Sequence, residues 1–331
     1  TFAPDDLYVT AGAGVTVDEL QAFVSEHGMH VPLASPWPDT SLGGLLSRGL
    51  NAPLRMRYGA LRDVMLCATV AMADGSVIRA GRPLVKNVAG YDLPKLFVGA
   101  QGTLGVLTDV TLKLTPEPRA RRSLAVPVTA PADGLRLAAA VASHALVASS
   151  IVLADVADVV GFTTPYALVY TAEGLSEDVD AELAAAARTL RQSGAPVVVE
   201  SAFTGVDAWR RALGHSDAAT LTLRVGVPVM QLPALLRRPL PAAGPLCIDY
   251  AAGHVYLRMA ATAPATAEQL ADLRRTALGM DGYAVLLETH AARAAGLDPW
   301  GAQPSSLALM QRLKDRWDPA HILNPHAFLV Q

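Results

Sequence analysis

Hydrophobic and polar positions alternate with different periods along the chain, and each period predicts a different kind of element. Near the start, apolar residues at positions 7, 9 and 11 alternate with polar or small ones, which predicts a strand that ends at Gly12. A helix is expected next, because Thr16 and Glu19 form a T-x-x-E capping box and Gly28 follows as an ending residue. The predicted buried stripe of this helix is Val17, Leu20, Phe23 and Val24.

Period-two patterns recur on both sides of a predicted tight turn. Apolar segments between residues 64 and 80 flank the pair Asp74-Gly75, which is favoured in short β-hairpins. Residues 106–114 alternate again, until two prolines interrupt the pattern. We expect the basic residues that follow to form a solvated linker, near a domain boundary at position 120. These residues are Arg119, Arg121 and Arg122.

The middle of the chain mixes helical and strand periods. Alanine-rich runs at 178–192 and 266–278 predict helices, and the segments 167–170, 197–199 and 221–227 predict strands. This alternation is typical of an α+β domain with an antiparallel sheet. A last helix is expected before Asp318-Pro319, and its predicted apolar face consists of Leu307, Met310, Leu313 and Trp317.

Composition favours a dense globular protein that acts on small molecules. The 331 residues are 51% hydrophobic and 17% charged, and the formal charge of −3 gives no reason to expect nucleic acid or an anionic membrane as a partner. Cys67 and Cys247 are isolated in apolar stretches, so we expect reduced core thiols and a cytoplasmic protein. No apolar run reaches the roughly 20 residues of a membrane span. No signal peptide opens the chain, and any membrane association is expected to run through partners.

The densest motif is the stretch KNVAGYDLPKLFVGAQGTLGV, from Lys86 to Val106. It contains four glycines, Gly90, Gly99, Gly102 and Gly105. Glycine is needed where a backbone takes a positive φ or lies directly against a ligand. Four glycines in one apolar run therefore predict a cofactor cradle, although the same glycines could merely turn the chain.

Further motifs surround this stretch in a specific order. They are TSLGG from Thr40, RYG from Arg57 followed by Arg62 and Asp63, the Asp-Gly turn, and VLTDVTLKLTP from Val106. Together they resemble the FAD-binding domain of the PCMH-type flavoproteins of the vanillyl-alcohol-oxidase superfamily. Within that superfamily the sequence of these motifs is most similar to the E-type subunits of bacterial glycolate oxidases, where KN-AGYD, LFVG-GTLGVLT and a terminal DP-ILNP recur together.

This resemblance implies an α+β fold in which a PCMH-type FAD-binding domain carries an inserted cap domain with an antiparallel sheet. The expected divisions are 1–122 for the second half of the FAD-binding domain, 123–290 for the cap, and 291–331 for a segment that packs back on the FAD-binding domain. The first strands of the family, with a glycine-rich pyrophosphate loop, would precede Thr1. We therefore expect this chain alone to hold little FAD.

The resemblance also implies non-covalent FAD and a set of contacts to it. Backbone amides near Gly43 and Gly44 would bind the pyrophosphate, and a side chain added at Gly102 or Gly105 would fill ligand space. The predicted contact residues are Ser41, Leu42, Gly43, Gly44, Tyr58, Gly59, Gly102, Thr103, Leu104, Gly105, Val106 and Asn324.

Two motifs keep a structural alternative, and a third departs from the family pattern. Tyr58 and Gly59, with the Arg62-Asp63 pair, could be a surface turn with an ion pair. Lys86 and Asn87 could place a cation and an amide near the flavin carbonyls, or Lys86 could simply be solvated. The tail reads NPHAF from Asn324 to Phe328, whereas the family usually has Gly and Arg after Asn-Pro, so an anion contact there is not expected.

The histidines form no recognisable metal site. His27 and His30 have H-x-x-H spacing but straddle Gly28, and we expect both at the surface. His254 lies where catalytic D-type relatives carry a G-D-G-N-x-H motif that is absent here, so we expect a satisfied strand residue, with a general base as the alternative. The run GAGVTV from Gly12 lacks the third glycine of a Rossmann fingerprint, which argues against a nicotinamide site.

The function that the resemblance implies is an FAD-binding subunit of a glycolate (2-hydroxy acid) oxidase complex. Its partners would be a D-type flavoprotein subunit and an iron-sulfur subunit that receives the electrons. No catalytic residue can be assigned from the sequence. Two alternatives stay open, a non-catalytic structural subunit of that complex and a stand-alone FAD-dependent oxidase of another alcohol or sugar.

Overall fold

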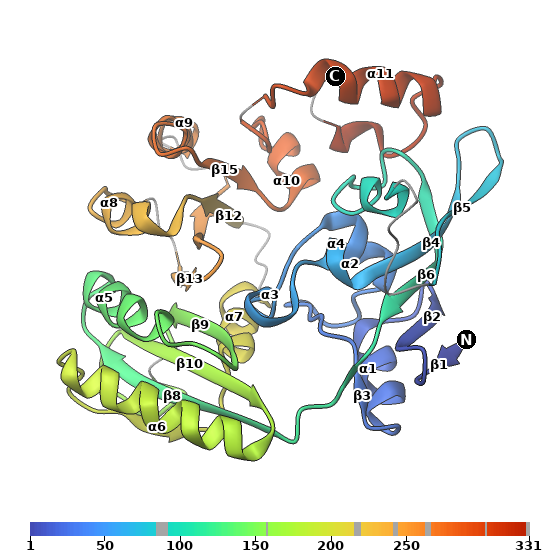
Figure 1. Cartoon of the computed structure of the whole chain (residues 1–331). Coiled ribbons are helices and arrows are strands. Elements are labelled where there is room, and N and C mark those ends of the chain that lie inside the picture. Colours follow the sequence, from blue (N-terminus) through green and yellow to red (C-terminus); the bar gives the residue numbers. More distant parts are fainter. Residues whose placement is uncertain are drawn as a thin grey trace. The chain divides into compact units, whose positions relative to one another are not determined.

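The computed structural model describes residues 1–83, 92–156, 158–214, 220–240, 244–261, 266–301 and 303–328. The chain divides into two compact units, one formed by Thr1–Glu117 with Gln303–Gln331 and the other by Pro118–Ala302 (Figure 1). The predicted contacts at Lys86 and Asn87, and the glycine at position 90, lie outside the described residues. The functional division at residues 122 and 290 stays a prediction.

The first unit is built on a five-stranded antiparallel sheet in the order β1-β2-β6-β4-β5. Its strands are β1 (Phe2–Ala3), β2 (Tyr8–Gly12), β4 (Met65–Ala71), β5 (Val77–Gly81) and β6 (Val106–Lys113), and β3 (Met29–His30) pairs separately with β7 (Thr115–Pro116). Its helices are α1 (Val17–Ser25), α2 (Leu42–Arg48), α3 (Arg55–Tyr58), α4 (Leu61–Val64), η1 (Leu93–Leu96), α11 (Leu307–Trp317) and η3 (Pro325–Ala327).

The predicted start of α1 is confirmed in atomic detail. Thr16 Oγ1 accepts a hydrogen bond from the Glu19 amide at 3.1 Å, and the Glu19 carboxylate accepts one from the Thr16 amide at 2.8 Å. Three of the four predicted stripe residues are buried, but Phe23 is 46% exposed, so that part of the prediction is wrong. The Phe23 ring instead packs at the surface against the rings of Phe2 and His27.

The predicted hairpin is confirmed as the antiparallel pair β4 and β5. Gly75 has φ +83°, a conformation that favours glycine, and Asp74 Oδ1 accepts a hydrogen bond from the Ser76 amide at 2.9 Å. This turn aligns β5 beside β4, whose other neighbour is β6. β6 starts at Val106, so the hairpin supports the strand that leads out of the glycine-rich stretch.

The second unit is built on an eight-stranded antiparallel sheet in the order β11-β8-β10-β9-β13-β14-β12-β15. Its strands are β8 (Ala120–Val128), β9 (Ala148–Ala154), β10 (Tyr166–Gly174), β11 (Val199–Ser201), β12 (Thr220–Gly226), β13 (Cys247–Asp249), β14 (His254–Ala260) and β15 (Tyr283–Leu286). Its helices are α5 (Pro131–Ala142), α6 (Ser176–Gln192), α7 (Gly205–Gly214), η2 (Val229–Gln231), α8 (Leu232–Leu236), α9 (Thr266–Leu278) and α10 (Thr289–Ala294). The expected α+β class with an antiparallel sheet is confirmed.

Helices pack on both faces of this sheet. Gly134 of α5 lies against Leu153 of β9, where an added Cβ would come within 2.6 Å of the leucine side chain. Gly205 of α7 lies against Ser150 and Val152 of the same strand. Because consecutive strand residues point to opposite faces, α5 and α7 cover opposite faces of the sheet. Figure 1 shows α5 and α6 side by side within this unit.

The predicted basic linker is instead the start of a strand. Arg121 and Arg122 belong to β8, and Arg121 Nε donates a hydrogen bond to Glu173 Oε2 at 2.6 Å from the facing strand β10. The Glu173 side chain is fully buried, and a buried carboxylate needs a charged or hydrogen-bonding partner. The prediction of a solvated linker is therefore wrong for Arg121, although its own side chain stays 44% exposed.

Candidate functional site

The glycine-rich stretch of residues 101–106, here named the cofactor loop, follows η1 and ends at Val106, the first residue of β6. The Gln101 amide donates a hydrogen bond to the Ser47 carbonyl at 2.8 Å, so the loop begins against the last turn of α2. Thr103 and Leu104 are buried, whereas the apolar side chain of Val106 is 54% exposed. The loop therefore presents a small apolar surface next to a fixed backbone.

Glycine occupies the positions of this stretch for different physical reasons. Gly102 has φ +70°, and an added Cβ would meet no atom within 4 Å, so its open side leaves room for a ligand. At Gly105 an added Cβ would lie 2.5 Å from Val70 Cγ1, and at Gly49 it would lie 2.7 Å from Gly99 Cα. Close packing inside the unit explains the glycines at 105 and 49, whereas Gly99 has φ +78° and an added Cβ there would come no closer than 3.9 Å to Gly49 Cα. The expectation that a side chain at Gly105 would fill ligand space is therefore wrong.

The start of α2 holds the predicted pyrophosphate motif. Ser41 caps the helix by accepting the Gly44 amide on Oγ at 3.1 Å. The Leu42 amide donates to the Val15 carbonyl and the Gly43 amide to the Ala13 carbonyl, each at 2.8 Å. These three amides donate hydrogen bonds to acceptors within the chain. The expected role of the Gly43 and Gly44 amides in binding the pyrophosphate is therefore wrong. Contact of residues 41–44 with FAD through other atoms stays a prediction.

The predicted contacts Tyr58 and Gly59 end the short helix α3. Gly59 has φ +85°, and a Cβ added there would lie 3.0 Å from Asp63 Oδ2. Asp63 Oδ2 accepts the Ala60 amide at 2.9 Å, so this carboxylate caps α4. The structure thus gives Asp63 a helix-capping role, and a role of Tyr58 or Gly59 in binding FAD stays a prediction.

His30 is not at the surface, contrary to the expectation for the H-x-x-H pair. It is 7% exposed, because β3 pairs with β7 and places its ring beside Thr115, with Nδ1 3.2 Å from the Pro116 carbonyl. The ring also contacts Tyr58 edge-on at 5.3 Å between centroids. His27 is exposed, as expected. Among the described residues, no group of three or more His, Cys, Asp or Glu could hold a metal ion.

The carboxyl-terminal segment brings Asn324 onto the cofactor loop. Asn324 has φ +42°, and its side-chain amide donates a hydrogen bond to the Gln101 carbonyl. Trp317 of α11 stacks on Phe97, with ring centroids 5.9 Å apart. Two predicted contact regions, separated by more than 200 residues in the sequence, are therefore joined in one unit.

Sequence reasoning missed a buried ion pair in this segment. Lys314 and Asp318 pair with side chains that are 2% and 0% exposed, and Lys314 Nζ also donates to the Thr103 carbonyl at 2.8 Å. The predicted apolar face of α11 is only half-buried, while Lys314 is its one fully buried residue within the described chain. The available signal was the i,i+4 spacing of Lys314 and Asp318 just before Pro319, but a lysine normally indicates an exposed face.

The second unit holds a row of polar side chains on three neighbouring strands. We name it the polar row, and it consists of Arg224 of β12, His254 and Tyr256 of β14, and Tyr283 of β15. His254 Nε2 is 3.1 Å from the Tyr283 hydroxyl, and His254 Nδ1 is 3.4 Å from the Tyr256 hydroxyl. Both ring nitrogens of His254 therefore have partners, as expected for a satisfied strand residue.

The register of the strands creates this row. Gly226 of β12 pairs with His254 on one side and with Tyr283 on the other. Because Gly226 has no side chain, the Tyr283 ring lies over it, where an added Cβ would come within 2.6 Å of the ring. The tyrosine hydroxyl can then reach across to the histidine. Such a contact between residues 29 positions apart carries no signal in the local sequence.

The electrostatics of the row are asymmetric. The Arg224 guanidinium lies 5.5 Å from the centre of the Tyr283 ring, and its Nε has no hydrogen-bond partner in the part of the chain that the structure describes. Burial raises the pKa of the Tyr256 phenol, which therefore stays a neutral hydroxyl. A guanidinium is suited to a carboxylate, which it can bind through two parallel hydrogen bonds.

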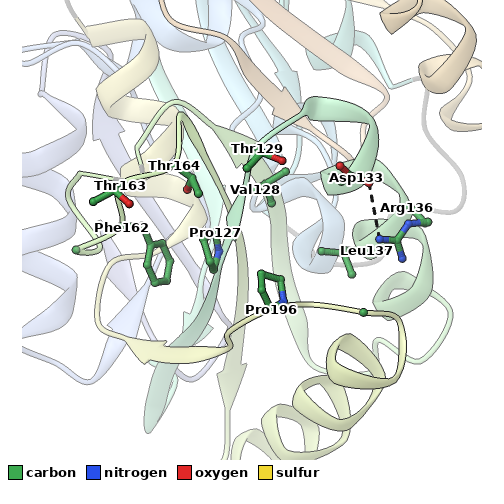
Figure 2. A pocket seen from close by; sticks show the side chains of 12 residues that line it. Pro127, Val128, Thr129, Asp133, Arg136, Leu137, Phe162, Thr163, Thr164 and Pro196 are labelled. Atoms are coloured by element: carbon green, nitrogen blue, oxygen red, sulfur yellow. Dashed lines mark ion pairs between the residues drawn. The ribbon is translucent and has the colours of Figure 1, made fainter.

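A separate cavity in the second unit has a different character. It measures about 580 Å³ and lies between β8, the start of α5 and the loops around residues 161–164 and 194–196 (Figure 2). Its walls are mainly apolar, with Phe162 on one side, while Asp133 and Arg136 lie together on the other with 3.8 Å between their charged atoms. Because these two charges face each other, the polar row is the better candidate for binding an anion.

Comparison with known proteins finds two domain models and several proteins to which parts of this chain are similar. A model of the FAD binding domain matches residues 1–81, and a model of the C-terminal domain of FAD linked oxidases matches residues 299–327. The chain is 37% identical over 125 residues to glycolate oxidase subunit GlcE of Escherichia coli and 36% identical over 121 residues to glycolate oxidase subunit GlcD of Bacillus subtilis. It is also 36% identical over 115 residues to a mitochondrial D-lactate dehydrogenase of Arabidopsis thaliana.

These matches cover only part of each protein. They include 37%, 36% and 35% of this chain and 36%, 26% and 20% of the three relatives, so about a third or less of each relative is matched. A solved structure of alkyldihydroxyacetonephosphate synthase superposes on 98% of this chain and 64% of its own, with a TM-score of 0.68 and 16% identity. This likeness shows the fold.

The two matched domains indicate FAD as the cofactor. The first unit fits FAD at the cofactor loop but not at the start of α2. The open side of Gly102 and the exposed Val106 offer the space and the apolar surface that a flavin ring needs. The amides of residues 42–44 already donate hydrogen bonds within the chain, so they do not offer the expected phosphate contacts. When bound, FAD would supply the capacity to accept two electrons from a substrate. In the described residues no helix is both long and apolar enough to cross a membrane.

Proposed function

We propose that this chain, which carries both domains of the FAD-linked oxidases, is the FAD-binding subunit of a glycolate-type 2-hydroxy acid oxidoreductase. Its partners would be a D-type flavoprotein subunit and an iron-sulfur subunit that takes up the electrons. The relatives named as glycolate oxidase subunits and as D-lactate dehydrogenases support this substrate class. The observation that carries the proposal is Arg224, a half-buried cation without an acidic partner in the described chain, which lies over the Tyr283 ring.

The polar row could perform two tasks on a 2-hydroxy acid. Arg224 would bind the carboxylate through its guanidinium and fix the orientation of the acid. His254 Nε2 already shares a hydrogen bond with the Tyr283 hydroxyl at 3.1 Å, so a proton released by the substrate hydroxyl could pass through the tyrosine oxygen to the ring nitrogen. In this proposal His254 is a base that acts through Tyr283, and Tyr256 holds its other nitrogen.

A non-catalytic structural subunit is the second candidate, and specific observations favour it. The amides of residues 42–44 are all donated within the chain, and both His254 ring nitrogens have hydroxyl partners. Polar groups that are already satisfied within the chain need no ligand. In that case Arg224 would contribute to the stability of the protein and not to turnover.

Turnover of glycolate and D-lactate by the assembled complex, followed with an artificial electron acceptor, tests the proposal. We expect Arg224→Met to raise KM for both acids by at least about tenfold, the effect of one lost hydrogen bond to a charged group. FAD content should stay unchanged. Arg188→Met is the matched control, because Arg188 is an exposed arginine on α6 of the same unit. Unchanged kinetics of Arg224→Met would support the structural subunit instead.

A further inference from the structure

The buried Lys314 joins three segments of the first unit. Its ammonium group donates to the Thr103 carbonyl at 2.8 Å, to the Leu323 carbonyl at 2.9 Å and to the Asp318 carboxylate. Asp318 in turn accepts the amides of Ile322 at 3.0 Å and Leu323 at 2.9 Å. All three protons of Lys314 are used, and no water is needed to satisfy the pair.

The bond to Thr103 has a directional consequence for the cofactor loop. A trans peptide is planar, so its carbonyl and its amide N–H point in opposite directions. Since the Thr103 carbonyl is held toward Lys314, the N–H of Leu104 points away from the ion pair. That amide has no hydrogen-bond acceptor among the described residues, although Leu104 itself is only 8% exposed. An amide without an acceptor in the chain is available to donate to a ligand or to water.

We propose that Lys314 is a positioning residue, which fixes the Thr103–Leu104 peptide so that the Leu104 amide donates to an acceptor atom of the bound cofactor. The inference rests on the proposed binding of FAD, whose ring carbonyls and nitrogens are acceptors. Lys314 itself does not touch the cofactor in this proposal. Its ammonium acts through one backbone carbonyl, and Asp318 keeps that ammonium oriented.

This positioning role also explains why the lysine at position 314 is buried. Helix α11 could be attached to the unit by apolar contacts alone, as the stacking of Trp317 on Phe97 illustrates. A buried ion pair often adds little stability compared with well-packed apolar residues of similar volume. It does, however, fix directions, because each hydrogen bond requires a defined geometry. The pair is therefore better explained by the orientation of the loop than by stability.

The test compares the parent chain with variants by two measurements on the full chain. One is amide hydrogen exchange without FAD, and the other is the dissociation constant for FAD. Lys314→Met leaves Asp318 buried and unpaired and could unfold the unit, so the informative variant is Lys314→Met with Asp318→Leu, which replaces the pair by apolar side chains. We expect faster exchange in residues 103–106 and a Kd for FAD that rises about tenfold, as for one lost hydrogen bond. The control is Lys95→Met, which removes an exposed Lys–Asp pair with Asp92 from the same unit.

Each outcome has a defined meaning. Unchanged exchange of residues 103–106 in a folded double variant would overturn the positioning role, whether or not FAD binds. Faster exchange with an unchanged Kd would also overturn it, because the loop would then be ordered by Lys314 without consequence for the cofactor. Absence of FAD binding by the parent chain would agree with the expectation that this chain alone holds little FAD, and it would overturn the role of the Leu104 amide toward the cofactor. The exchange comparison would still decide whether Lys314 orders the loop, and turnover by the assembled complex would still decide the proposed function.

Discussion

At the scale of single residues, the same residue type serves different purposes within one motif. Gly105 is a glycine because Val70 occupies the space of a side chain, and Gly99 is one because its φ of +78° is unfavourable for residues with a Cβ. Gly102 combines a positive φ with a side on which an added Cβ would meet no atom within 4 Å. The sequence shows three glycines at regular intervals but not which of them faces empty space, since that depends on β4 and α2, which are distant in the sequence.

This difference leads to a prediction for Gly102. An alanine there should strain the backbone by about 1–2 kcal/mol, because φ +70° is unfavourable for residues with a Cβ. Gly75→Ala is the matched control, since Gly75 also has a positive φ, of +83°, and an open side. We expect similar losses in the free energy of unfolding for both variants, measured by urea denaturation, and weaker FAD binding for Gly102→Ala alone. Equal FAD affinity of the two variants would argue against contact between Gly102 and the cofactor.

At the scale of elements, strongly periodic segments could be predicted and cross-strand arrangements could not. The helix predicted at 266–278 has the bounds of α9, and the capping box of α1 forms as expected. In contrast, the strand predicted at 197–199 begins only at Val199. The polar row was missed because its residues come from three strands whose register is set by tertiary packing. Lys314 was missed because the pattern of α11 assigns every lysine to solvent.

The ion pair of α11 should make the first unit sensitive to acid. Burial opposes ionisation of Asp318, but the hydrogen bonds from Lys314 and from the amides of Leu323 and Ile322 outweigh it and hold the pKa of this carboxyl below its usual value. A lowered pKa in the folded state means that the carboxylate stabilises the fold. This contribution is complete above the unfolded pKa of about 3.9 and is lost as the pH falls through the lower, folded value.

Urea denaturation at a series of pH values measures this effect. At pH 7 we expect Asp318→Asn to lower the free energy of unfolding by about 3–5 kcal/mol, because Lys314 is left buried without its counter-ion. The difference between parent and variant should shrink as the pH falls below about 4. Asp92→Asn, in an exposed pair, should change stability by less than about 0.5 kcal/mol. A difference that stays constant from pH 7 to pH 3 would show that the Asp318 carboxylate does not titrate as described.

At the scale of the whole molecule, the two units hold different parts of the proposed chemistry. The first unit carries the cofactor loop and Lys314, which is hydrogen-bonded to it. The second unit carries Arg224 and His254, whose ring lies between the hydroxyls of two tyrosines. The sequence indicated the first through motifs that resemble a known family. It did not indicate the second, because the expected G-D-G-N-x-H motif is absent and the polar row has no linear signature.

The last prediction concerns how the cofactor is held, and we expect FAD to be bound non-covalently. A covalent bond to a flavin requires a nucleophilic side chain such as Cys or His, and neither occurs in residues 41–44 or 101–106. Cys247 is buried, which raises the pKa of its thiol and disfavours the reactive thiolate. Cys67 is also buried, and its sulfur accepts a hydrogen bond from Arg79 Nε at 3.4 Å.

Acid precipitation of the FAD-loaded protein separates the two possibilities. A non-covalent cofactor loses its contacts when the chain unfolds, so all flavin absorbance should appear in the supernatant. Flavin that remains in the washed precipitate would establish a covalent link and contradict the prediction. A Cys67→Ser variant would then identify the attachment, since it would release the flavin only if that sulfur were the linked atom, whereas Cys247→Ser would serve as the matched control in the second unit.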